Sequence, residues 1–269
     1  MTTSNPVHHI SFTDGLAIQG DCCDPQVIEL VKNYVGGQVP LIIADPPYGN
    51  IVSEYWDKVV ETDSEYAAWM LGWTCAYMDL LMPGGAFYVW GGIGKPGFRP
   101  FYKYLIEAEE NTKLQLANHL TFAGKRGYGI QHNYLFVRQE LAYFCLGDIK
   151  KPRLFNVPLL EEERGYEGYN AKYPAKSKFK RRTNVWSDIT EILRGKRHVN
   201  EKPVRLHEIP IEVHTQAGEC VIDPFAGSGT TAGAARNLGR KFVVIERDEK
   251  EFQVMINRIN NPPKKDKKP

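Results

Sequence analysis

Residues 221–231 read V-I-D-P-F-A-G-S-G-T-T, and no other stretch says as much about the fold. A short apolar run ends at Asp223, a glycine-rich turn follows, and a helical pattern begins near Thr230. Gly227 and Gly229 allow a ligand to approach the backbone closely, and the first turn of a helix offers unpaired amide donors. We therefore predict a strand, a tight turn and a helix that together bind a ligand.

An acidic residue ends the next apolar run. Glu246 lies 19 residues after Gly227, and an acid in this place can accept hydrogen bonds from two ribose hydroxyls. The order of strand, turn, helix, strand and acid predicts a site for a nucleoside-containing cofactor. Residues 227–232 also match G-x-G-x-x-A, so a nicotinamide dinucleotide, and with it an oxidoreductase, is an alternative on this segment alone. The sequence shows no Tyr–Lys pair or catalytic histidine for hydride transfer.

Strand and helix patterns alternate along most of the chain. Apolar runs typical of strands in a parallel sheet lie at 16–19, 39–44, 86–90, 118–122, 140–145, 219–222 and 241–245. Helical spacing is found at 25–35, 66–81, 101–108, 204–215, 230–238 and 250–259. The helix over 204–215 is expected to be interrupted near Pro210. This alternation predicts an α/β fold with a doubly wound, mostly parallel sheet.

The second motif, I-I-A-D-P-P-Y-G at 42–49, places an acid directly after a buried strand. Pro46 and Pro47 hold the chain extended because proline fixes its own φ and restricts the residue before it. Asp45 offers a carboxylate, Pro46 a carbonyl and Tyr48 a flat ring. Two acceptors and a stacking surface suit a planar group that carries an exocyclic amino group. The alternative is that the motif forms a rigid turn whose tyrosine packs in the core.

Positive charge is concentrated in one region. The net charge of the chain is +2, yet residues 150–210 hold 15 Lys and Arg against 8 Asp and Glu. The region has weak periodicity and reads as an insertion. Basic residues with interleaved Tyr173 and Phe179 suit a phosphate backbone, although a solvated charged loop has a similar composition. The residues that we expect to contact nucleic acid are Lys172, Lys176, Lys178, Lys180, Arg181 and Arg182.

Several classes are excluded by composition. There is no run of 18 apolar residues, so no membrane span is expected, and residues 1–10 do not resemble a secretory signal. Five cysteines without a C-x-x-C pair argue against a disulfide framework and a zinc site, and fit the cytoplasm. We expect no metal. The histidines without metal spacing are interpreted as structural, and these are His132, His198, His207 and His214. The tryptophans Trp69, Trp73 and Trp90 are interpreted as core residues.

Together the two motifs resemble the amino-methylating DNA methyltransferases that use S-adenosylmethionine. The D-P-P-Y motif precedes the glycine-rich motif by 178 residues, from Asp45 to Asp223, with the basic region between them. That order resembles the permuted beta group, whose target-recognition region lies between the two halves. Other segments in the family's order are G-D at 20–21, L-M-P-G-G-A-F-Y at 81–88, H-N-Y-L-F-V-R-Q-E-L-A-Y-F at 132–144, N-V-W at 184–186, E-K-P-V-R-L at 201–206 and V-I-E-R-D at 244–248.

The resemblance implies a circularly permuted, seven-stranded methyltransferase sheet and a role for each motif. The implied catalytic residues are Asp45, Pro46, Pro47 and Tyr48, with Tyr48 stacking on a base flipped out of duplex DNA. Asp21 would bind the adenine of the cofactor, and Lys202 would belong to the segment that closes over its methionine end. The full set implied for the cofactor is Asp21, Cys22, Asp45, Lys202, Asp223, Pro224, Phe225, Ala226, Gly227, Ser228, Gly229, Thr230, Glu246 and Arg247.

The resemblance also implies a target and partners. An aspartate in the first position of D-P-P-Y is commoner in enzymes that methylate adenine N6, so adenine is expected, with cytosine N4 as the alternative. The family often has H-P-T before the K-P pair, where this chain has Asn200 in place of the threonine. Double-stranded DNA is the expected partner, and a cognate restriction endonuclease and a second copy of the chain are further candidates. A nucleic-acid-binding module without activity is the other alternative.

The expected organisation has four parts. Residues 1–149 form the catalytic half of one methyltransferase domain, and residues 150–198 the basic target-recognition insertion. Residues 199–261 form the cofactor-binding half, and 262–269 a basic disordered tail.

Overall fold

The computed structural model describes residues 7–48, 62–92, 94–128, 131–163, 177–189 and 202–261. Its strands are β1 (His8–Phe12), β2 (Gly15–Gln19), β3 (Val39–Ala44), β4 (Leu81–Gly91), β5 (Leu114–Tyr128), β6 (Phe136–Leu146), β7 (Leu159–Glu163), β8 (Phe179–Arg181), β9 (Val185–Trp186), β10 (Cys220–Asp223) and β11 (Lys241–Glu246). Its helices are α1 (Pro25–Val35), α2 (Asp63–Met78), α3 (Gly94–Asn111), α4 (Val204–His214), α5 (Thr230–Asn237) and α6 (Glu249–Asn260).

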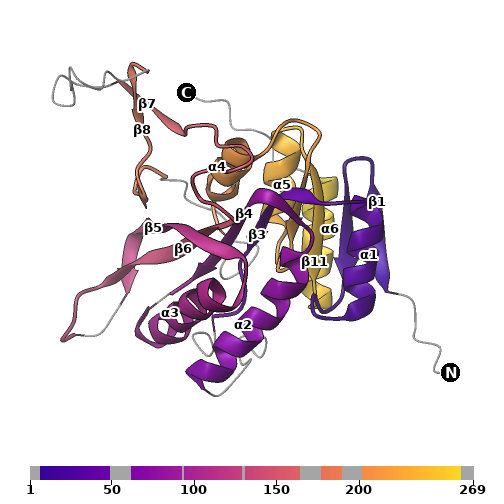
Figure 1. Cartoon of the computed structure of the whole chain (residues 1–269), viewed down its shortest axis with the longest axis horizontal. Coiled ribbons are helices and arrows are strands. Elements are labelled where there is room, and N and C mark those ends of the chain that lie inside the picture. The colour runs from indigo at the N-terminus through magenta and orange to yellow at the C-terminus, as the bar shows by residue number, and fades with distance from the viewer. Residues whose placement is uncertain are drawn as a thin grey trace.

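Within these residues one sheet of nine strands runs in the order β1-β2-β11-β10-β3-β4-β6-β5-β9 (Figure 1). The five strands β2, β11, β10, β3 and β4 are parallel to one another, whereas β1 is antiparallel to β2, and β6 is antiparallel to β4 and to β5. The predicted doubly wound, mostly parallel α/β fold is confirmed. The two strands beyond the seven expected are β1, which is half exposed, and β9, which has two residues. Neither carries enough of a pattern to be recognised in the sequence.

Helices cover both faces of the sheet. The core on one face joins the sheet to α1, α2 and α3, and the core on the other joins it to α4, α5 and α6. Strand β3 is fully buried and alternates between them, because Leu41 and Ile43 belong to one core and Ile42 and Ala44 to the other. Burial on both faces explains why this strand reads as a continuous apolar run.

Two helix predictions need correction. The helix expected to run to residue 81 ends at Met78, and Leu81 already begins β4. It begins at a capping box, in which the Thr62 side chain and Glu65 each satisfy the other's backbone amide. Helix α4 is continuous through Pro210 where an interruption was expected. Residues on both sides of this proline, such as Ile209 and Ile211, are buried, and their packing keeps the helix intact despite the lost amide donor.

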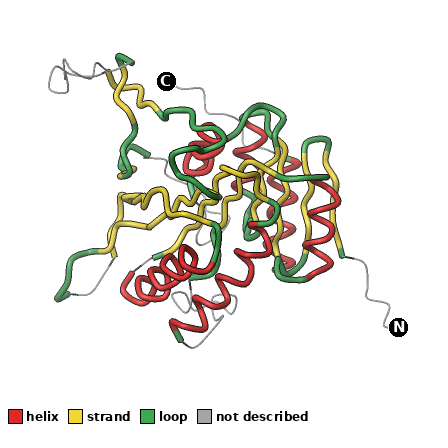
Figure 2. The backbone as a smooth tube through the Cα atoms, viewed as in Figure 1, coloured by secondary structure: helices red, strands yellow, loops and turns green. Residues whose placement is uncertain are grey.

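The basic region lies largely outside the main sheet. Strands β7 and β8 pair with each other as a separate antiparallel ribbon beside the sheet (Figure 2). Strand β9 instead pairs with β5, through Val185 and Trp186, so the chain returns to the main sheet before α4. Lys172, Lys176, His198 and Asn200 lie outside the described residues.

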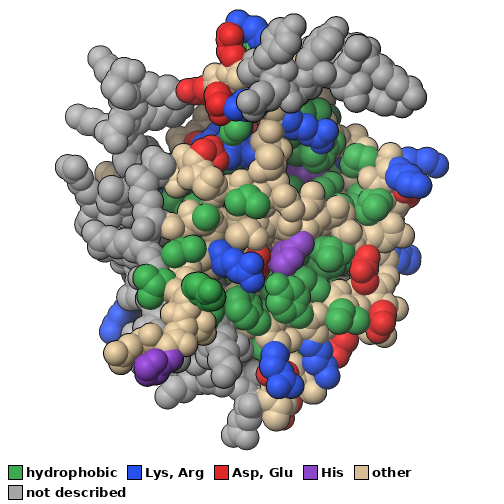
Figure 3. Space-filling model, turned by 90° about the vertical axis from the view of Figure 1, so that its left-hand side faces the viewer, with side chains coloured by type: hydrophobic (Ala, Val, Ile, Leu, Met, Phe, Trp, Pro, Cys, Tyr) green, Lys and Arg blue, Asp and Glu red, His purple; other side chains and the backbone are tan. Residues whose placement is uncertain are grey.

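The β5 end of the sheet exposes apolar side chains. Figure 3 looks onto this end and shows hydrophobic side chains gathered around basic ones. Tyr134, Leu135, Val137 and Val185 are among the exposed large hydrophobic residues. In the described parts of the chain, no helix has the length and apolar character that crossing a bilayer demands.

A buried histidine fastens the segment before β7 to the core. His214 of α4 is 2% exposed, its Nε2 accepts a hydrogen bond from the Tyr88 hydroxyl at 3.0 Å, and its Nδ1–H donates to the Leu154 carbonyl at 3.0 Å. Burial lowers the pKa of His214 from 6.5 to about 4. Since the unfolded chain binds this proton more readily, the stability that neutral His214 contributes is lost as the pH falls from 6.5 towards 4.

We expect His214→Gln to remove this acid sensitivity, because the amide can satisfy both partners and does not titrate. Between pH 7.5 and pH 5 the wild type should lose roughly 2 kcal/mol more unfolding free energy than the variant. Urea unfolding at the two pH values measures the difference. Equal losses in the two proteins would mean that His214 is protonated as easily in the folded as in the unfolded chain.

Candidate active site

Four adjacent parallel strands each end in an acidic residue. In sheet order, β2 leads to Asp21, β11 ends at Glu246, β10 ends at Asp223 and β3 leads to Asp45. The carboxyl ends of parallel strands meet at one edge of a sheet, so local patterns of apolar run and acid place all four side chains there. Each of these four acids is predicted from the sequence to be a site residue, and the fold brings them together.

A cavity of about 290 Å³ opens along this edge. Of the fourteen residues expected to contact the cofactor, all but Gly229 line it, and so do Pro46, Pro47 and Tyr48, which are predicted to be catalytic. One end is formed by Asp21, Cys22 and Arg247, and Glu246 borders its middle. The volume lies near the lower end of the range, about 300–1,000 Å³, that is usual for small-molecule sites.

The glycine-rich turn uses its backbone to hold the acids. Gly227 and Gly229 have φ of 49° and 81°, which a residue with a side chain rarely adopts. The Gly227 amide donates to Glu246 Oε2 at 2.9 Å, and the Asp248 amide donates to Oε1 at 2.7 Å. Burial raises the pKa of Glu246, and the two hydrogen bonds from backbone amides oppose this shift. A Cβ placed on Gly227 would meet no atom within 4 Å, so the turn leaves open space on its cavity side.

Asp223 begins a buried chain of polar groups. Its Oδ1 accepts from the Phe225 amide at 2.9 Å, and its Oδ2 accepts from the Thr231 hydroxyl. The Thr231 oxygen lies 2.8 Å from His207 Nδ1 on α4. Burial raises the pKa of Asp223 to about 7 and lowers the pKa of His207 to about 3. The imidazole is therefore neutral at physiological pH.

Asp45 is held by a second buried network. Its Oδ1 accepts from the Tyr48 hydroxyl at 2.5 Å, and its Oδ2 accepts from the Lys202 ammonium. Lys202 Nζ also donates to the Tyr48 hydroxyl at 2.7 Å and lies 4.9 Å from the centre of the Trp90 ring. Burial lowers the pKa of Lys202, and the Asp45 carboxylate opposes that shift. Both carboxylate oxygens thus have a donor from the chain itself.

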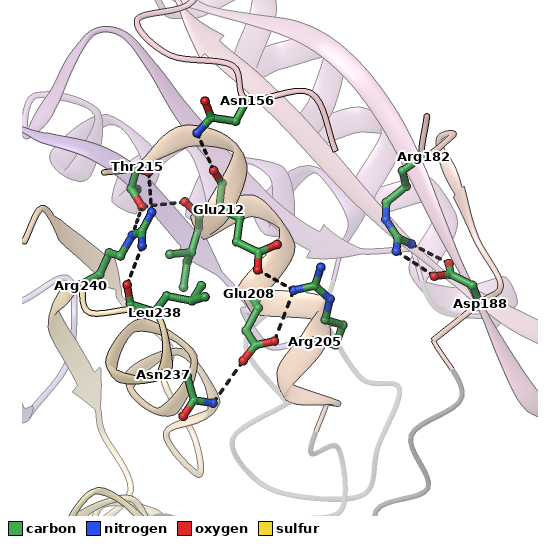
Figure 4. A network of polar contacts seen from close by, with 11 residues as sticks. Asn156, Arg182, Asp188, Arg205, Glu208, Glu212, Thr215, Asn237, Leu238 and Arg240 are labelled. Atoms are coloured by element: carbon green, nitrogen blue, oxygen red, sulfur yellow. Dashed lines mark hydrogen bonds and ion pairs between the residues drawn. The ribbon is translucent and has the colours of Figure 1, made fainter. Parts of the chain in front are cut away.

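A polar network on the outer side of α4 sets the position of Lys202 and His207. Arg205 contacts Glu208 at 3.4 Å and Glu212 at 2.9 Å, and Glu208 accepts from Asn237 of α5 at 3.1 Å (Figure 4). Asn156 donates to the Glu212 carbonyl at 2.9 Å. These bonds tie α4 to α5 and to the segment before β7, and so fix the wall of the cavity that α4 supplies.

The basic residues expected to contact nucleic acid differ in exposure. Lys178 is 70% exposed and pairs with Glu163, while Lys180 pairs with Glu162. Arg182 is only 7% exposed and donates to both oxygens of Asp188 at 2.6 and 2.7 Å. Its guanidinium therefore has a structural partner, whereas Lys178 and Lys180 stay near solvent on the β7–β8 ribbon.

Six residues that line the cavity are not among the site residues predicted from the sequence: Gly20, Trp69, His207, Ile245, Asp248 and Glu251. His207 and Trp69 line it, although both were interpreted as structural or core residues. Trp69 packs edge-on against Phe225 at 5.9 Å between ring centres. Their neighbours come from other elements, and helical spacing alone cannot distinguish a residue that faces a cavity from one that faces the core. Asp21, Cys22 and Cys23 also place three donor atoms within 4.8 Å of one another, and the expectation of no metal stays a prediction.

Comparison with known proteins gives consistent matches over most of the chain. The profile of a DNA methylase family, N6_N4_Mtase, matches residues 39–257. The type II methyltransferase M.BamHI of Bacillus amyloliquefaciens is 32% identical over 272 residues, which covers 96% of this chain and 60% of that protein. The chain therefore spans well under two thirds of this relative's length. M.HpaI of Haemophilus parainfluenzae is 24% identical over 87% of this chain and 72% of its own.

Solved structures share the fold. The complex of M1.HpyAVI with S-adenosylmethionine has a TM-score of 0.62 and 23% identity, and covers 91% of this chain and 98% of its own. The PvuII DNA methyltransferase, described as cytosine-N4-specific, has a TM-score of 0.63 and 17% identity, with 94% and 95% covered.

Proposed function

The chain belongs to the DNA methylase family whose profile spans residues 39–257, and we propose that it transfers a methyl group from S-adenosylmethionine to an exocyclic amino group of a DNA base. The observation that carries the proposal is the junction of the two motifs in one cavity, where Asp45 and Pro46 border the same space as Asp223 and Glu246. Family membership also leaves the oxidoreductase alternative without support.

The residues of the cavity fit S-adenosylmethionine. Glu246 is held by two backbone amides in the middle of the cavity, where its carboxylate would accept from the ribose hydroxyls. Asp21 at one end would accept from the adenine amino group, and Phe225 and Ile245 supply apolar wall. The open side of Gly227 leaves room for the sugar. Asp223, Lys202 and Thr230 would surround the methionine end.

S-adenosylmethionine, when bound, supplies a methyl group on a positively charged sulfur. An exocyclic amino nitrogen is a poor nucleophile because its lone pair is delocalised into the ring. Asp45 and the Pro46 carbonyl would accept its two N–H bonds and favour a pyramidal nitrogen with a localised lone pair. A carbon–nitrogen bond would form as the carbon–sulfur bond breaks and leaves a neutral thioether, and the methylated nitrogen would then release one N–H proton to solvent. Asp45 stabilises the charge that develops on the nitrogen, an effect that is strong in a site shielded from water.

The base must leave the duplex before it can reach Asp45, since its amino group is inaccessible within the stack. Tyr48 would stack on the base, and its ring is held in place by its own hydroxyl bond to Asp45 and by Lys202. Duplex DNA is the proposed partner, with Lys178, Lys180 and Arg181 on or beside the ribbon as candidates for phosphate contacts. A second copy of the chain and a cognate restriction endonuclease stay predictions.

Adenine N6 is the target that we propose, because Asp45 occupies the first position of the motif as in the adenine enzymes that it resembles. Cytosine N4 is the second candidate, and the likeness in fold to the cytosine-N4-specific PvuII enzyme favours it. Both bases present an amino group beside a ring nitrogen, so the acceptors Asp45 and Pro46 serve either one.

Incubation with labelled S-adenosylmethionine and unmethylated duplex DNA, followed by nucleoside mass spectrometry, tests this function. We expect N6-methyladenine, and mapping of the modified positions would give the recognition sequence. N4-methylcytosine would keep the chemistry and replace the base. Labelled RNA or protein, with DNA unlabelled, would contradict the proposed substrate, and cofactor binding without any methylated product would point to a binding module.

A further inference from the structure

His207 presents a polar atom to the cavity that the mechanism above does not use. The residue lies in the first turns of α4, is 3% exposed, and lines the cavity beside Lys202 and Thr230. Its Nδ1 is 2.8 Å from the Thr231 oxygen. Its Nε2 has no hydrogen-bond partner among the residues that the structure describes. A polar atom without a partner, on a residue that lines a ligand cavity, points to a contact with the ligand.

The protons of the Asp223–Thr231–His207 chain can be assigned. When Asp223 is ionised, the Thr231 hydroxyl donates its single hydrogen to Asp223 Oδ2. The Thr231 oxygen must then accept from His207, so the imidazole proton is on Nδ1. A neutral imidazole protonated on Nδ1 carries a lone pair on Nε2. His207 therefore offers the cavity a hydrogen-bond acceptor, and Thr231 and Asp223 fix that tautomer.

The position of His207 in the cavity indicates which part of the ligand it contacts. The acids that suit the nucleoside, Asp21 and Glu246, lie on β2 and β11, whereas His207 and Lys202 lie on the α4 side near Asp45. The amino-acid tail of S-adenosylmethionine carries an ammonium and a carboxylate. An acceptor such as Nε2 pairs with the ammonium and would repel the carboxylate.

Resting on the proposed function, we propose that His207 Nε2 accepts a hydrogen bond from the α-ammonium group of S-adenosylmethionine, with Thr231 and Asp223 as positioning residues. His207 is then a cofactor-binding residue that recognises the amino-acid tail of the ligand. The contact makes the protein discriminate between adenosyl ligands with the tail and adenosyl ligands without it.

Calorimetric binding of three ligands tests the proposal, and it needs no catalysis. S-adenosylmethionine and S-adenosylhomocysteine carry the tail, whereas 5′-methylthioadenosine lacks it. We expect His207→Leu to weaken both tailed ligands by about 10- to 100-fold, the range for a hydrogen bond to a charged group, and to change 5′-methylthioadenosine less than about twofold. His214→Gln, which alters a buried histidine away from the cavity, is the matched control and should leave all three unchanged.

Two amide variants separate the contact from packing. The amide of glutamine reaches the place of Nε2, so His207→Gln should keep most of the affinity for the tailed ligands. The amide of asparagine reaches only the place of Nδ1, so His207→Asn should bind them as weakly as His207→Leu. Equal loss for all three ligands, or no loss for any, would overturn the proposal. Failure of the wild type to bind even 5′-methylthioadenosine would instead contradict the proposed function itself.

Discussion

Asp45→Asn is expected to lower the rate of methyl transfer about 10³-fold, or ~4 kcal/mol in transition-state free energy, while the affinity for S-adenosylmethionine changes little. The amide oxygen of asparagine can still accept from Lys202, and its NH2 group can donate to the Tyr48 hydroxyl, so the packing is kept, but the negative charge that stabilises the reacting nitrogen is gone. Single-turnover methylation gives the rate, and calorimetry gives the cofactor affinity. Asp45→Ala should be at least as inactive.

Asp79→Asn is the matched control for this variant. Asp79 is an exposed aspartate at the end of α2 and does not line the cavity, so its loss of charge should leave the rate unchanged. A parallel fall in rate and cofactor affinity for Asp45→Asn would assign Asp45 to cofactor binding. An unchanged rate would remove Asp45 from the mechanism.

The largest expected effect on stability also involves Asp45. In Asp45→Ala the Lys202 ammonium is left 5% exposed without its carboxylate, and we expect the free energy of unfolding to fall by about 3 kcal/mol. Adding Lys202→Met should restore most of this loss, since it removes the stranded charge and keeps the side chain against Trp90 and Tyr48. Urea unfolding of the ligand-free single and double variants completes the cycle.

The pH dependence of Asp45→Ala offers a second readout. Without the Asp45 carboxylate, burial lowers the pKa of Lys202 further and only the charge of Asp223 opposes it, so the folded chain holds this proton less tightly than the unfolded chain. The stability of the variant should therefore rise as the pH increases from 7 to 9, and the double variant should lack this rise. Additive losses in the two single variants would mean that the pair does not interact in the folded protein.

The Lys202 contact also bears on substrate entry. Both oxygens of Asp45 already have donors, the Tyr48 hydroxyl and Lys202. Each oxygen of an ionised carboxylate can accept a further hydrogen bond, so an incoming amino group can bind Asp45 while both donors stay in place. Lys202 thus holds the acceptor in position while the base is absent.

Local sequence patterns were sufficient to predict the acidic edge of the site. Asp45, Asp223 and Glu246 directly follow an apolar run, Asp21 follows one after Gln19 and Gly20, and parallel strands bring such ends to one edge of the sheet. The pairing of Lys202 with Asp45 joins residues 157 positions apart, and no local pattern signals it. The position of His207 in the cavity wall could not be predicted for the same reason, because its partner Thr231 lies on another helix. Strands β1 and β9 could not be predicted from the sequence because few of their residues are buried.

The order of the strands in the sheet differs from their order along the chain, and this has a consequence for folding during synthesis. Strands β2 and β3 are made early but never touch, since β10 and β11 lie between them. A growing chain that lacks its last strands has two separate pieces of sheet, each with an open edge that can pair with another chain. The sheet can close only after β10 and β11 have left the ribosome, so the two early pieces must wait for residues 220–246 before they join.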